Sequence, residues 1–214
     1  PVKRRKRPLA AGELSPRAAL LLLLALYGVL AVGYWLMPRA GMIVIGYVLL
    51  NIAHTYLLKL QPVIDIFSIA IGFMLRVYAG AEAIAVPVSS WMFVTTLCLA
   101  LYLASIKRRQ ELNWAGGTGR AVLAHYTAPL LDRFAQTAAT GARIFYSLFV
   151  MSTRPELVAT IPFVLFGLFR YQWLVEVREL GESPADALLG DWQLILTVLF
   201  WLGMCAYAVG HRLT

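Results

Sequence analysis

Seven blocks of mainly apolar residues, each close to the length that crosses a lipid bilayer, constrain this chain more than any other feature. A membrane-spanning helix needs roughly 20 such residues, and backbone polar groups in lipid must be satisfied within the segment, which favours helices. The composition is 60% hydrophobic and 14% charged, against about 45–50% and about 25% in soluble domains. The sequence therefore predicts an all-α, polytopic transmembrane helix bundle of about seven spans, at residues 18–36, 41–58, 63–81, 91–106, 139–151, 157–175 and 194–209.

The basic residues are distributed unevenly between the two sides of such a bundle. The net charge of +8 would also suit a nucleic-acid-binding protein, but with the cluster at 3–7 placed inside, most Lys and Arg residues fall in loops on that same side. This asymmetry follows the positive-inside rule. We therefore expect no nucleic-acid partner. We expect a single membrane domain over 1–214, with a cytoplasmic N-terminus, an external C-terminus and cytoplasmic segments at 1–17, 107–133 and 176–192.

Polar residues within or beside the spans are the candidates for function, because such residues are costly in lipid. A first group surrounds the end of the second span: Asn51 and His54 share a helical face, Lys59 stands at the membrane boundary, and Asp65 opens the next helix. The plainer interpretation is structural, with a Lys side chain reaching the headgroups and an Asp stabilising a helix N-terminus. Asn51 and His54 fit it less well, because both fall inside a span.

A second group follows the fourth span, where Lys107, Arg108, Arg109 and Glu111 occur together. A positive-inside anchor accounts for the three cations but does not require Glu111 four residues after Lys107. The cations could instead hold phosphate oxygens, with Arg giving bidentate contacts. Both interpretations stay open.

Three further features of the chain bear on function. The loop after the second group carries Gly-Gly-Thr-Gly at 116–119, then Arg120 and Tyr126; glycines beside an Arg could hold an anion, although a flexible turn explains them as well. Arg76 lies deep in the third span, so it should face the bundle interior and meet an acceptor. Arg170, near the inner end of the sixth span, is expected to reach the interface.

Three stretches resemble the UbiA-type superfamily of intramembrane prenyltransferases, and in particular its decaprenyl-phosphate phosphoribosyltransferase branch. They are Lys-Arg-Arg-Lys-Arg-Pro-Leu-Ala-Ala-Gly-Glu-Leu-Ser at 3–15, Leu-Lys at 58–59 with Asp-Ile-Phe-Ser-Ile-Ala-Ile-Gly-Phe-Met-Leu-Arg-Val-Tyr-Ala-Gly at 65–80, and Lys-Arg-Arg-Gln-Glu-Leu at 107–112. The resemblance implies a nine-span fold in a bacterial plasma membrane, with an Asn-Asp-rich, magnesium-binding motif just before the basic segment. We therefore expect that the sequence is N-terminally truncated, that the main metal ligands lie upstream of Pro1, and that these residues alone are inactive. His54 stands where the family pattern has Tyr.

The resemblance also implies a reaction and a set of residue roles. Members of this branch transfer 5-phosphoribosyl from phosphoribosyl pyrophosphate to a polyprenyl (decaprenyl) phosphate, release diphosphate and use Mg²⁺. Asp65 and Glu111 would be catalytic, binding ribose hydroxyls or supporting a second magnesium ion. The expected substrate contacts, with the cations on phosphates, are Asn51, Lys59, Lys107, Arg108, Arg109 and Tyr126. The partners are then the two substrates and the lipid bilayer, and the oligomeric state is left open.

Two other functions compete with this one. An ordinary superfamily member would move a prenyl group from its diphosphate to an aromatic acceptor such as 4-hydroxybenzoate, and it would carry an Asp-rich loop where this chain has Lys-Arg-Arg-Gln-Glu. A transporter or membrane scaffold would carry helices interrupted at mid-depth by Gly or Pro, at matching places in two halves. Gly72 and Gly203 form no such pair.

Overall fold

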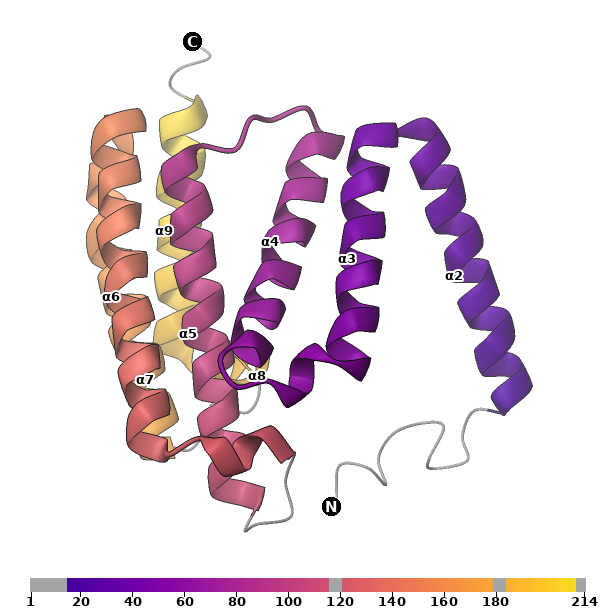
Figure 1. Ribbon diagram of the computed structural model, residues 1–214. Coiled ribbons are helices and arrows are strands. Elements are labelled where there is room, and N and C mark those ends of the chain that lie inside the picture. The colour runs from indigo at the N-terminus through magenta and orange to yellow at the C-terminus, as the bar shows by residue number, and fades with distance from the viewer. Residues whose placement is uncertain (1–14, 116–120, 179–183, 211–214) are drawn as a thin grey trace.

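A computed structural model describes residues 15–115, 121–178 and 184–210, and within these ranges the chain is a bundle of helices without strands (Figure 1). The basic cluster at 3–7, the Gly-Gly-Thr-Gly run and Arg120 lie outside the described residues. The long helices are α2 (Pro16–Leu36), α3 (Pro38–Tyr56), α4 (Ile64–Ala83), α5 (Ser90–Ala115), α6 (Ala128–Thr153), α7 (Ile161–Arg178) and α9 (Trp192–Gly210). Shorter elements connect some of them: η1 (Leu58–Leu60), η2 (Ala121–His125), η3 (Pro155–Thr160) and α8 (Pro184–Gly190).

The predicted all-α polytopic membrane bundle is confirmed. Each predicted span overlaps one long helix. By length and composition, four helices in the described part of the chain could cross a membrane, at Pro16–Leu36, Ile64–Ala83, Ser90–Asn113 and Pro155–Val177. A fifth span is added if α8 and α9, which meet at 94°, are counted as one. The helices α3 and α6 are not among these four, and both carry polar residues within the predicted spans, such as Asn51, His54 and Arg143.

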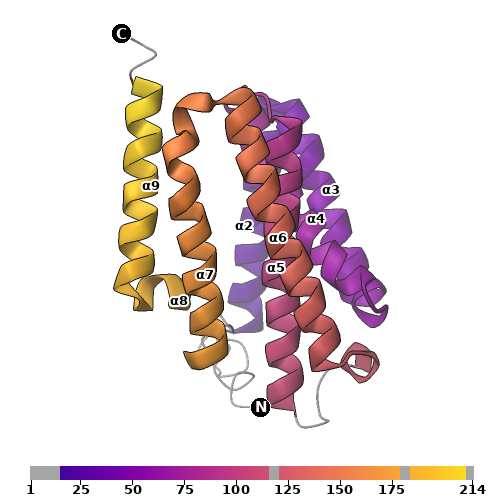
Figure 2. The same ribbon diagram turned by 90° about the vertical axis from the view of Figure 1, so that its left-hand side faces the viewer.

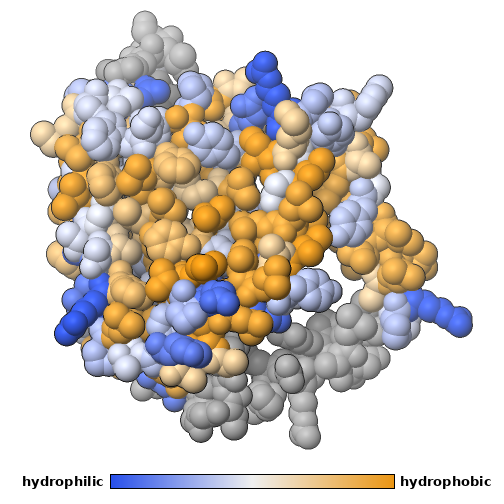
Figure 3. Space-filling view, viewed as in Figure 1, coloured by the Kyte–Doolittle hydropathy of each residue, from blue (hydrophilic) through white to orange (hydrophobic). Residues whose placement is uncertain are grey.

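The helices run alternately up and down, so consecutive connections fall at opposite ends (Figure 1). Helix α5 stands between α4 and α6 (Figures 1 and 2). Helices α3 and then α2 lie beyond α4, and α7 and α9 lie on the opposite side of the bundle, with α6. Figure 3 shows hydrophobic residues across the middle of one face and hydrophilic residues toward its upper and lower edges. This distribution suits a bundle whose middle is in hydrocarbon and whose ends are in water.

Close packing of α5 against α6 forms the frame of the bundle. The buried positions of α6 include Ala135, Ala138, Ala139 and Ala142, which recur at three- and four-residue intervals and so line one face of the helix. At Gly141 an added Cβ would lie 2.9 Å from the Cys98 sulfur on α5. Small residues let two helix backbones approach closely in a membrane, so this pair holds its ends at a fixed separation.

One expectation about the ends of the spans requires correction. The segment 107–133 was expected to be a loop, but α5 continues to Ala115 and α6 begins at Ala128, so Lys107 and its neighbours are helical. That Arg170 reaches the interface stays a prediction; in the structure its guanidinium Nη2 lies 2.7 Å from the buried Asp191 carboxylate. The other Asp191 oxygen accepts from the Leu194 backbone N–H at 3.0 Å, so one carboxylate ties α7 to the start of α9.

Candidate active site

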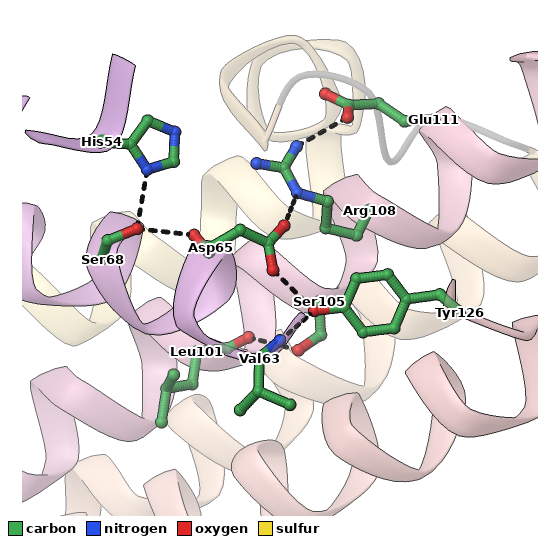
Figure 4. Close-up of polar contacts among 9 residues, drawn as sticks. All are labelled: His54, Val63, Asp65, Ser68, Leu101, Ser105, Arg108, Glu111 and Tyr126. Carbon is green, nitrogen blue, oxygen red and sulfur yellow. Dashed lines mark hydrogen bonds and ion pairs between the residues drawn. The ribbon is translucent and has the colours of Figure 1, made fainter. Parts of the chain in front are cut away.

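The candidate site is built around Asp65, at the end of the bundle where α4 begins, which we call the site end. Asp65 lies in the first turn of α4 and is 0% exposed. One carboxylate oxygen lies 2.6 Å from Arg108 Nε, and the other accepts a hydrogen bond from the Tyr126 hydroxyl at 2.6 Å (Figure 4). A buried carboxylate needs such partners, because an unpaired charge away from water is strongly unfavourable.

Arg108 completes the cluster from α5. Its side chain is 1% exposed, and its Nη1 donates to Glu111 Oε2 at 2.6 Å, one turn further along the helix. The guanidinium therefore bridges two carboxylates, one buried and one that is 26% exposed. Four residues that the sequence selected thus come together from three segments, and we call them the Asp65 cluster: Asp65, Arg108, Glu111 and Tyr126.

An unusual turn leads into Asp65. Val63 has φ 67° and ψ −47°, and the Ile64 N–H donates to the Pro62 carbonyl at 2.8 Å. This is a γ-turn of the rare, strained kind, which costs on the order of 1–3 kcal/mol and is especially unusual for a β-branched residue. The Val63 N–H donates to the Tyr126 hydroxyl at 2.6 Å. The sequence carries no glycine here to signal the turn.

Tyr126 gives the site a measurable pH dependence. Burial, together with the hydrogen bond to Asp65, raises the pKa of Tyr126 from 10.0 to about 12. The protonated hydroxyl therefore stabilises the fold fully below pH 10, and this contribution is lost as the pH rises through about 12. We expect the stability difference between the wild type and Tyr126→Phe to shrink between those pH values in thermal unfolding. A difference that stays constant over that range would contradict this assignment.

Of the remaining predicted cations, one is paired with carboxylates in the described residues and two are not. Arg109 faces the other way from Arg108: its guanidinium holds both oxygens of Glu176 on α7, and its Nε lies 2.8 Å from Asp132 on α6. Lys107 is exposed and Lys59, in η1, is half-buried. Within the part of the chain that the structure describes, neither lysine has a hydrogen bond or an ion pair.

The polar residues of α3 meet α4 beside the cluster rather than in it. His54 Nδ1 lies 2.7 Å from the Ser68 hydroxyl, which donates to the Asp65 backbone carbonyl at 2.9 Å, so Nδ1 is the donor to Ser68 (Figure 4). Asn51 is exposed, and its amide donates to the Tyr47 carbonyl at 2.8 Å. His54, Ser68 and Asn51 border a cavity of about 100 Å³ between the two helices.

Arg76, expected in the bundle interior, is exposed on α4 and borders the same cavity as His54 and Ser68, so the interior placement was wrong but the expected acceptor is present. Its Nε donates to the Gly72 carbonyl at 3.3 Å, and its guanidinium lies 4.3 Å from the centre of the Phe73 ring and 5.4 Å from that of Tyr47. A carbonyl and two aromatic faces thus serve as the acceptors for this charge.

The sequence selected Asp65 and Glu111 as candidate metal ligands. Among the described residues, no three His, Cys, Asp or Glu side chains converge as a metal site would require. Arg108 stands between Asp65 and Glu111, and its guanidinium already bonds an oxygen of each. As they are placed, these carboxylates do not fit a bound metal ion.

Sequence similarity extends over almost the whole chain. The chain is 30% identical over 216 residues to the decaprenyl-phosphate phosphoribosyltransferase of Mycobacterium tuberculosis, a match that covers 96% of this chain and 70% of that protein. The chain belongs to this family. The enzymes of the same name from Mycolicibacterium smegmatis, 30% identical, and Corynebacterium glutamicum, 31% identical, match 96% of the chain and 70% and 66% of their own lengths. No protein-family model matches the chain. The predicted membership of the decaprenyl-phosphate phosphoribosyltransferase branch is therefore confirmed.

Proposed function

We propose that this protein transfers the 5-phosphoribosyl group of phosphoribosyl pyrophosphate to a polyprenyl phosphate, and that decaprenyl phosphate is the acceptor. Family membership over 96% of the chain carries the proposal. The site supports it, because cations and carboxylates gather at one end of a membrane bundle. There a water-soluble donor and the headgroup of a lipid acceptor can meet.

We expect the two site lysines to stabilise the transition state. Negative charge develops on the diphosphate as its bond to the ribosyl carbon breaks, so cations directed at it lower the barrier. Lys59 and Lys107 are free to do this, since neither is neutralised by a carboxylate in the described residues. That Arg109 also binds a phosphate stays a prediction, and its guanidinium would first have to leave Glu176 and Asp132.

The carboxylates take different roles in this proposal. Glu111 is partly exposed and can accept hydrogen bonds from ribose hydroxyls while Arg108 holds it. Asp65 is fully buried, so it acts through the groups that it orients, Arg108 and Tyr126. Contacts of Asn51 and Tyr126 with substrate stay predictions.

Magnesium dependence also stays a prediction. Because Asp65 and Glu111 do not fit a metal ion as placed, we propose that magnesium arrives with the donor diphosphate and is not held by these two residues. We further propose that the site end faces the cytoplasm of a bacterial plasma membrane, where the donor is available and where the positive-inside rule places the basic segments.

The test uses the full-length protein in liposomes with labelled phosphoribosyl pyrophosphate, magnesium and decaprenyl phosphate. Label in the lipid phase that disappears with EDTA is the expected result. A parallel reaction supplies a prenyl diphosphate and 4-hydroxybenzoate. Turnover there, with no label in the first reaction, would overturn the proposal in favour of aromatic prenyl transfer, and no turnover in either would leave the enzyme class without support. For variants that remove a cation of the site, Arg39→Ala serves as the matched control, because Arg39 is 85% exposed and lies at the other end of α3.

A further inference from the structure

The strained turn at Val63 separates the two halves of the site. Lys59 lies in η1 just before the turn, and Asp65 lies just after it. Val63 holds φ 67° although the residue is 42% exposed, so close packing around it does not force the conformation. An L-residue with a branched Cβ leaves this region readily unless other contacts hold it.

The contact that holds the turn comes from a distant part of the chain. Tyr126 follows η2, which packs against η1, and the residue is 5% exposed. Its hydroxyl accepts from the Val63 N–H and donates to the Asp65 carboxylate, both at 2.6 Å (Figure 4). One oxygen atom therefore ties the backbone of the turn to the carboxylate that binds Arg108.

We propose that Tyr126 is a positioning residue: its hydroxyl holds the strained Val63 turn and so sets Lys59 and Asp65 relative to Arg108. This inference rests on the proposed function for its effect on catalysis, but not for its effect on the turn. It differs from a substrate contact, because the hydroxyl already donates to one protein group and accepts from another. Displacing a positioned group by even 1 Å can cost on the order of 100-fold in rate.

The decisive experiment combines Tyr126→Phe with Val63→Gly. Glycine adopts a positive φ without strain, so the turn no longer needs the hydroxyl to hold it. Tyr126→Phe alone is expected to lower kcat on the order of 10- to 100-fold with little change in KM. Val63→Gly alone should lower activity by no more than about threefold, and in that background Tyr126→Phe should cost less than about fivefold.

Equal losses of activity in the two backgrounds would overturn the proposal. Removing a hydroxyl that contacts substrate would cost the same activity whichever residue occupies position 63. If Tyr126→Phe does not fold, recovery of folded protein in the double variant supports the proposal, and failure of both variants overturns it. Tyr146→Phe is the matched control: this buried hydroxyl bonds Thr160 at 2.6 Å and the Trp201 indole at 2.9 Å, far along α6 from the site end.

A second measurement does not depend on the reaction. Hydrogen–deuterium exchange of a peptide spanning residues 57–66 should quicken in Tyr126→Phe, because the Val63 N–H loses its acceptor, and should stay unchanged in Tyr146→Phe. Unchanged exchange in Tyr126→Phe would overturn the proposal that Tyr126 holds the Val63 turn, even if the enzyme is active. If the wild type transfers no phosphoribosyl group, the exchange result still decides whether Tyr126 holds the turn, so the two proposals fail separately.

Discussion

Replacing Arg108 by Met is expected to lower the free energy of unfolding by about 3–5 kcal/mol. Met is an unbranched apolar side chain of similar length, but it lacks the charge that lies 2.6 Å from the Asp65 carboxylate in the wild type. Asp65 is fully buried and α4 holds it in place, so it cannot turn toward water. An ionised carboxylate left without its partner in the interior is among the costliest defects that one substitution can create. Equilibrium unfolding in mixed micelles, followed by Trp fluorescence, measures the loss.

Two further variants separate the buried pair from the general effect of removing a cation. Arg39→Met deletes an exposed charge whose nearest carboxylate, on Glu82, is 3.8 Å away, and exposed pairs contribute at most about 1 kcal/mol. Adding Asp65→Asn to Arg108→Met removes the stranded charge, so the double variant should be more stable than Arg108→Met alone. If all three variants lose the same stability, the ion pair is not what stabilises this end of the bundle.

The helices were predictable from the sequence because lipid leaves the backbone few alternatives. The ends were not, since the apolar pattern stops near residue 106 while α5 runs to Ala115. Those last turns are polar, and they stay packed because Arg108 and Arg109 find carboxylates on other helices. Such partners are distant in sequence, so no local pattern announces them.

The composition of the site was predictable, but its pairing was not. The sequence drew attention to Glu111 through its spacing from Lys107, whereas the structure pairs Glu111 with Arg108. Neighbouring residues on a helix point about 100° apart, so the rotation of α5 against α4 decides which cation meets Asp65. Asp132, Glu176 and Ser68 were missed for the same reason. The γ-turn at Val63 lacks any residue that favours it, and only tertiary contacts reveal it.

The double substitution Lys59→Ala, Lys107→Ala is expected to abolish most transfer while leaving stability unchanged. Each charge-assisted hydrogen bond to a phosphate is worth about 1.5–3 kcal/mol, which corresponds to about 10- to 100-fold per lysine. Together they should lower kcat/KM on the order of 10²- to 10⁴-fold if the two act independently. The free energy of unfolding should not change, because neither lysine has a partner in the described part of the chain that the substitution would remove.

This combination of results distinguishes the lysines from Arg108, whose removal should lower stability and activity together. The single variants show whether each lysine binds donor or acceptor, since a contact to one substrate raises the KM for that substrate more than for the other. Lys59→Arg and Lys107→Arg keep the charge and should recover part of the activity, because Arg also binds phosphate. Arg39→Ala, at the far end of α3, controls for the loss of a basic residue in general. Full activity in the Lys59/Lys107 double variant would show that the substrate phosphates are bound elsewhere, and Arg109, released from Glu176 and Asp132, would then be the cation to test.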